Sequence, residues 1–177
     1  MKKRYVFASI FLLCIVAAGC GMVQSMVKST LPYTTTLTIP ASATIGSTQS
    51  AISMAKSFEQ NFSISGKGGQ YISEVSIISA KLESTQPATY NLGNLSSVKI
   101  YVSKADGKDE VLVAFRTDIT NDAGNTLALD TDNKRFLDKL VREKEIRVRM
   151  AYTVRQKADT DVSVFLALGV NAYPAGN

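Results

Sequence analysis

The feature that most constrains the fold is a strict alternation of apolar and polar residues between positions 145 and 155. One set of side chains is Ile146, Val148, Met150, Tyr152 and Val154, and the other is Arg147, Arg149, Ala151, Thr153 and Arg155. Successive side chains of a β-strand point to opposite faces of the sheet, so a period of two predicts a strand with one buried face.

Two neighbouring segments show the same period around a turn. Ser97–Lys104 and Asp109–Arg116 alternate on either side of Asp106-Gly107, and glycine tolerates the positive φ that tight turns require. Together they predict a β-hairpin. Tyr71–Leu82 also alternates, with a slip in phase that indicates a β-bulge. In Asp161–Tyr173 apolar residues recur at every second position, which predicts another core strand.

The remaining segments carry weaker patterns. Thr126–Leu129 and Phe58–Ile64 are short strand candidates, whereas Ile45–Lys56 fits neither the strand nor the helix period. Asp132–Val141 differs from all of these, because its apolar residues recur at helical spacing behind an Asp or Asn that can cap a helix. One or two helical turns are expected there.

Seven or eight strands separated by turns, with one short helical excursion near 132–141 and no βαβ rhythm, predict an all-β protein. We expect a single antiparallel β-sandwich of immunoglobulin-like architecture over residues 33–177, with an open barrel as the alternative. An immunoglobulin domain in the strict sense is not implied, because this part of the chain has neither a cysteine pair nor a tryptophan.

Composition excludes several kinds of active site. The 177-residue chain contains no His and no Trp, so Ser-His-Asp and Cys-His catalysis, His-ligated zinc and tryptophan platforms for sugars are ruled out. The paired acids Glu143/Glu145 and Asp159/Asp161 flank predicted strands at turns, and nothing in the sequence supplies the cleft that glycoside hydrolysis needs. We therefore expect no enzymatic activity and no cofactor.

The N-terminus has the pattern of an export signal. Basic residues at 2–4 precede an apolar stretch from Tyr5 to Val16, which is too short to span a bilayer as a helix. Val16-Ala17-Ala18-Gly19-Cys20 resembles the lipobox of bacterial lipoproteins, with Ala17 where that family usually has Leu. The resemblance implies a signal peptide at 1–19, acylation of Cys20 and a flexible linker over 20–32.

This resemblance also implies a location. Cys14 would be removed with the signal, leaving Cys20 as the one cysteine of the mature chain, unable to form an internal disulfide. The absence of Asp immediately after Cys20 resembles lipoproteins of the outer membrane, and we expect a lipid anchor there with the domain facing the periplasm. Without Lys2, Lys3 and Arg4 the basic residues fall from 20 to 17 against 15 acidic ones, so nucleic acid is not an expected partner.

The acidic residues around position 130 form the best metal candidate. Asp130, Asp132 and Asp138 offer the hard oxygen ligands that calcium prefers. The spacing departs from an EF-hand loop, because Lys134 and Arg135 stand where a ligand and a glycine belong. A solvated turn with a helix cap explains the same residues, so no metal is expected.

Three arginines form the best anion-binding candidate. Arg147, Arg149 and Arg155 would project from one side of the strongest strand if it is regular, and could bind phosphates, acidic glycans or lipid headgroups. The same residues could equally form a solvated outer face. We expect a noncatalytic, membrane-tethered lipoprotein that supports or binds another envelope protein, with a binding module for acidic glycan or lipid headgroups as the alternative.

Overall fold

The computed structural model describes residues 31–56, 72–132, 137–141 and 143–174. The predicted signal peptide, Cys20 and the strand candidate Phe58–Ile64 lie outside these ranges. The described residues form eight strands and two short helical segments: β1 (Leu31–Ile39), β2 (Thr48–Lys56), β3 (Ile72–Gln86), η3 (Leu92–Asn94), β4 (Leu95–Lys104), β5 (Val111–Arg116), β6 (Thr126–Thr131), α3 (Asp138–Val141), β7 (Glu145–Val154) and β8 (Val162–Pro174).

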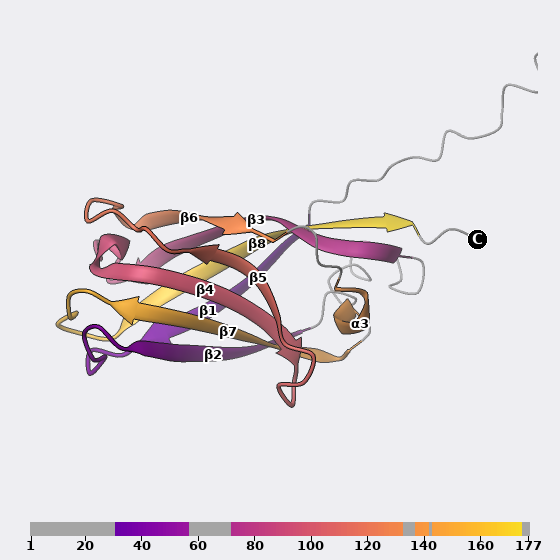
Figure 1. Cartoon of the computed structure of the whole chain (residues 1–177), viewed down its shortest axis with the longest axis horizontal. Coiled ribbons are helices and arrows are strands. Elements are labelled where there is room, and N and C mark those ends of the chain that lie inside the picture. The colour runs from indigo at the N-terminus through magenta and orange to yellow at the C-terminus, as the bar shows by residue number, and fades with distance from the viewer. Residues whose placement is uncertain (1–30, 57–71, 133–136, 142, 175–177) are drawn as a thin grey trace, which may run out of the picture.

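All eight strands belong to one antiparallel sheet with the order β1-β8-β3-β6-β5-β4-β7-β2 (Figure 1). The two halves of this sheet join through only two residue pairs between β5 and β6, Ala114 with Thr131 and Phe115 with Asp130. At the other end, β1 and β2 contact each other without forming a ladder, and the Thr35 and Ser53 hydroxyls share a hydrogen bond of 2.7 Å. The sheet is therefore nearly closed, in the manner of a barrel.

The curled sheet encloses one apolar core. Residues from most strands reach it, and Leu37, Leu82, Ile100, Val148 and Leu166 are almost fully buried. Burial of this many aliphatic side chains is the main favourable term of folding, at roughly 25 cal/mol for each Å² of apolar surface removed from water.

The all-β antiparallel prediction is confirmed, whereas the sandwich is not, because one continuous sheet curls until its ends nearly meet. The β4–β5 hairpin, β7 and β8 match the predicted alternation closely. The expected bulge is present in β3, whose register against β8 shifts between Ser73 and Ser76 and again between Ile77 and Ser79. Phe165 and Ala167 are half-buried on the outer side of β8, as predicted.

A short helix lies within the expected range, and the unassigned segment contains a strand. Within the described part of the expected helical excursion, only α3 is helical, since Asp132 follows β6 directly. The segment left without an assignment, Ile45–Lys56, contains β2, which pairs along its whole length with β7. Its inward residues include Ala51, whereas Ile52 and Met54 point outward and are exposed, so its apolar pattern is weak and inverted.

Candidate functional site

The outer face of β2, β7 and the β4–β5 hairpin gathers the most distinctive side chains of the described protein. Antiparallel register places Ile52 opposite Arg149 and Met54 opposite Arg147, and Tyr101 of β4 pairs with Arg149 from the other side. Directly opposed residues lie on the same face of a sheet. We call the set Ile52, Met54, Tyr101, Glu110, Arg147 and Arg149 the arginine face.

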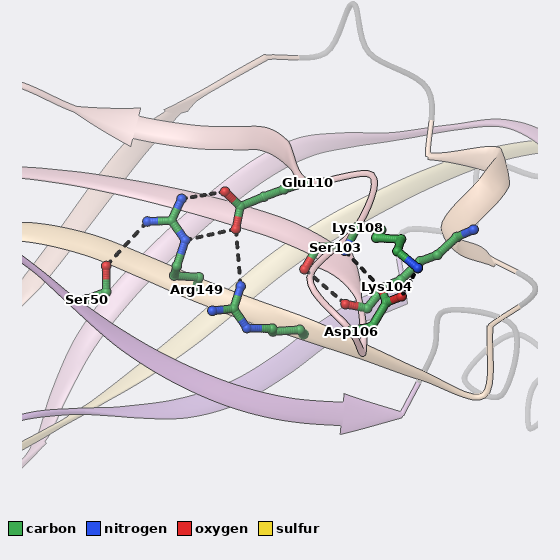
Figure 2. A network of polar contacts seen from close by, with 8 residues as sticks. Ser50, Ser103, Lys104, Asp106, Lys108, Glu110 and Arg149 are labelled. Atoms are coloured by element: carbon green, nitrogen blue, oxygen red, sulfur yellow. Dashed lines mark hydrogen bonds and ion pairs between the residues drawn. The ribbon is translucent and has the colours of Figure 1, made fainter.

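Arg149 is the most constrained residue of the arginine face. Its Nε and Nη2 donate hydrogen bonds to the two oxygens of Glu110, at 2.8 and 2.5 Å, and its Nη1 donates to the Ser50 hydroxyl at 3.3 Å (Figure 2). Its guanidinium carbon also lies 4.2 Å from the centroid of the Tyr101 ring, which adds a cation–π contact. The paired hydrogen bonds to one carboxylate, together with stacking on the tyrosine ring, hold the Arg149 guanidinium in one orientation.

Arg147 shares the same carboxylate less closely. Its Nη1 lies 3.3 Å from Oε1 of Glu110, and the Arg147, Arg149 and Glu110 side chains keep between 22% and 27% of their surface exposed. Two positive groups thus share one negative group in a partly dehydrated setting. The hydrogen bonds from Arg149 are the main cause of the lowered pKa of Glu110, and the same contacts raise the pKa of Arg149.

The hairpin turn that carries Glu110 is held by short local contacts. Gly107 has a φ of 84° and its N–H donates to the Lys104 carbonyl, which fits the predicted glycine turn. Asp106 accepts a hydrogen bond from the Lys108 main chain, which is the main cause of its lowered pKa. Asp109 has a φ of 54°, and the chain then enters β5 at Val111. The turn therefore presents Glu110 to the arginines of β7.

A cavity of about 510 Å³ lies between this turn and α3. Its apolar lining is Val111, Leu137 and Leu140, and its polar lining is Asp109, Glu110, Asp138 and Lys139. The three carboxylates already have partners: Lys104 for Asp109, Arg149 for Glu110, and the main-chain N–H of Val75 for Asp138. Asp109 and Glu110 are therefore paired with positive side chains, whereas Asp138 accepts a main-chain N–H.

The structure separates the three arginines that the sequence grouped together. β7 ends at Val154, so Arg155 lies beyond the strand, roughly 20 Å along the chain from Arg149 at about 3.3 Å per residue. Arg155 donates to the carbonyls of Gly93 and Ile119 and to the side-chain oxygen of Asn121, at 2.8, 3.0 and 2.5 Å. Only Arg147 and Arg149 share a site.

The acidic residues proposed as a weak calcium candidate are also occupied. Asp130 forms an ion pair with Arg116 at 3.4 Å, and Asp138 accepts the Val75 N–H at 3.0 Å. Among the described residues, no three Cys, Asp or Glu side chains are arranged so that they could hold a metal ion. Cys20, the predicted lipidation site, is outside the described ranges.

Sequence reasoning missed Glu110, Ile52 and Met54. Glu110 is 37 and 39 residues from the arginines that it binds, and no local motif signals that contact. Ile52 and Met54 belong to the segment that matched neither period, yet they are 53% and 47% exposed on a paired strand. The alternation of Ile52 and Met54 with the small residues Ala51, Ser53 and Ala55 was the available signal in the sequence.

No protein-family model matches this chain, and a search of curated proteins finds no match for it. Within the ranges given above, no helix has the length and apolar character needed to cross a bilayer.

Proposed function

We propose that this chain is a noncatalytic lipoprotein of the bacterial cell envelope, anchored through acylated Cys20 and presenting its β-domain to another envelope protein. The lipobox-like segment Val16–Cys20 supports the anchor, and the lack of Asp after the cysteine supports the outer membrane, with the domain facing the periplasm. The domain supplies the binding surface.

The observation that carries the binding role is the composition of the arginine face. It places two exposed apolar side chains, Ile52 and Met54, beside a tyrosine and an arginine that already hold fixed positions. Aromatic residues, Met and Arg are enriched in protein interfaces, and Tyr and Arg are frequent among the residues that dominate binding energy. A rigid arginine loses little conformational freedom on binding, which favours affinity.

A headgroup- or glycan-binding role for Arg147, Arg149 and Arg155 is the second candidate. The free donors of Arg147 favour it, since its one hydrogen bond within the described residues leaves most of its N–H groups available to an anion. The engagement of Arg149 with Glu110 and of Arg155 with three acceptors weighs against it. We therefore rank it below protein binding.

We also propose that the sheet can be described as two layers, with β1-β8-β3-β6 facing β5-β4-β7-β2 across the core. The narrow β5–β6 connection supports this sandwich-like description. A full β1–β2 ladder would instead make it a closed barrel.

The anchor is tested by fractionating cells that carry the Cys20→Ser variant. We expect the variant to leave the membrane fraction, and mass spectrometry of the native chain to find acyl groups on Cys20. Retention of the variant in the membrane, or an unmodified thiol in the native chain, would contradict the anchor.

The binding role is tested by placing a photo-crosslinking amino acid at Ile52 in living cells. Thr36 is the matched control, because it is also exposed on the outer side of an end strand. We expect a discrete protein adduct from position 52 and none from position 36. Adducts with lipid alone, or equal labelling from both positions, would contradict protein binding by the arginine face.

A further inference from the structure

We propose that the partner is recognised by an acidic side chain that binds Arg147, flanked by an apolar side chain that packs on Met54 and Ile52. This inference rests on the proposed function and gives the chemistry of its partner: a protein segment with Glu or Asp next to an aliphatic residue.

The two arginines of the arginine face are engaged unequally. Arg149 uses its Nε and Nη2 on Glu110, its Nη1 on Ser50 and its flat face on Tyr101. Arg147 is held by one contact of 3.3 Å to a carboxylate that Arg149 already binds in bidentate fashion. A guanidinium carries five N–H donors, so Arg147 retains the capacity to bind a second carboxylate.

The arginine face carries an unbalanced positive charge. Arg147 and Arg149 carry two positive charges and Glu110 carries one negative charge, which leaves an excess of one. The lowered pKa of Glu110 keeps its carboxylate ionised at neutral pH, so the net charge of the three groups does not change around neutral pH. One carboxylate of a partner neutralises this excess. A lipid phosphodiester carries the same single charge, so the choice between the two depends on the apolar surface beside the arginines.

Apolar surface lies beside that charge. Met54 lies directly across from Arg147 and Ile52 directly across from Arg149, and both side chains are about half exposed. An aliphatic residue next to the partner's acid would cover Met54 and Ile52. Exclusion of water by those contacts strengthens the neighbouring ion pair, because charges interact more strongly in a low-dielectric setting.

The experiment titrates two probe peptides, acetyl-Ile-Glu-Ile-amide and acetyl-Ile-Gln-Ile-amide, into the full chain purified in detergent. The methyl resonance of Met54 and the Nε resonance of Arg147 report binding by NMR. We expect saturable shifts with the Glu peptide and about tenfold weaker binding of the Gln peptide, the size of one charge-assisted hydrogen bond. In a parallel titration, phosphatidylglycerol vesicles replace the peptides and offer a phosphate group in place of the carboxylate.

Variants assign the contacts. Arg147→Gln should remove the preference for the Glu peptide, while Lys157→Gln, an equal loss of charge at an exposed turn, should preserve it. Met54→Ser should weaken both peptides equally, which separates the apolar contact from the ionic one. Equal binding of the two peptides, a preference that survives Arg147→Gln, tighter binding to the vesicles, or no saturable shift with either peptide would overturn the inference.

The two proposals fail in different ways. A protein adduct from position 52 without any preference for the Glu peptide would retain the interaction role and refute the acidic partner. A clear Glu preference without a protein adduct would refute the interaction role and leave the acidic site as a property of the arginine face.

Discussion

Replacing Arg155 should destabilise the fold, although this residue lies at an exposed turn. Its guanidinium joins the end of β7 to two other parts of the chain, donating to Gly93 in η3 and to Ile119 and Asn121 between β5 and β6. The Arg155→Ala variant leaves the Gly93 and Ile119 carbonyls, both in partly buried hydrogen bonds, without this donor. The sequence alone had grouped Arg155 with an anion-binding stripe, so the prediction distinguishes a structural role from a binding role.

The magnitude follows from the number and setting of these bonds. A hydrogen bond to a charged group contributes about 1.5–3 kcal/mol, and exposure of this residue places each bond at or below the low end. The main-chain N–H groups of Arg155 and Gln156 still donate to the Asn94 carbonyl, so part of the contact between η3 and the end of β7 remains in the variant. We expect a loss of about 2–3 kcal/mol in the free energy of unfolding, or a fall of roughly 6–9 °C in Tm for a chain of this size.

Urea unfolding followed by circular dichroism or tyrosine fluorescence measures this loss, since the chain has no tryptophan. Arg155→Lys keeps the charge but lacks the planar fork, and should recover less than half of the loss. Lys157→Ala is the control, with an expected change below about 0.5 kcal/mol. A change below 0.5 kcal/mol in Arg155→Ala, or full recovery by lysine, would refute the structural role.

Three further predictions concern pH and backbone space. Because the folded-state pKa of Glu110 is lowered, its contribution to stability is present above its ordinary value of about 4.5 and is lost as pH falls through the lower folded value. The stability difference between the native chain and Glu110→Gln should therefore shrink as urea melts are repeated at falling pH below 4.5, and a difference that grows would contradict this sign. Burial raises the pKa of Tyr33, so its contribution is present below about pH 10 and is lost above it. Tyr33→Phe should reduce the slope of alkaline destabilisation, and an unchanged slope would count against burial as the cause. At Gly93 an added Cβ would collide with the main chain of Asn121, so Gly93→Ala should lower the free energy of unfolding by about 2 kcal/mol or more. Gly124 has open space around it, so Gly124→Ala should lower that free energy by only about 1 kcal/mol, because of its positive φ. Equal thermal melts of the two variants would refute the packing argument.

Much of the sheet could be predicted from the sequence because burial of one face imposes a period of two. β7 and β8 show this period clearly, since large aliphatic residues line their inner side. β2 does not, because it lies where β1 closes in and its inner positions hold small residues such as Ala51 and Ser53. In β2 the large apolar residues Ile52 and Met54 are on the exposed face and the small residues are on the inner face, which is the reverse of an ordinary half-buried strand.

Closure of the sheet and assembly of the site depend on contacts that periodicity does not encode. Whether the two halves join depends on the two pairs between β5 and β6. The arginines of β7 could be recognised as a cluster, but their relation to Glu110 required the position of a hairpin turn from a distant part of the chain. Arg155 left the cluster because β7 ends one residue before it.

The pairing of β1 with β8 sets the order of events during biogenesis. In the described sheet, the first strand forms its ladder with the last strand, and β3 also pairs with β8 from Ile72 to Gln86. Such long loops are slow to close, so native structure cannot be completed until residues 162–174 have emerged. A chain without β8 lacks the ladder partner of β1 and one ladder partner of β3, so truncation before Val162 should abolish the native state.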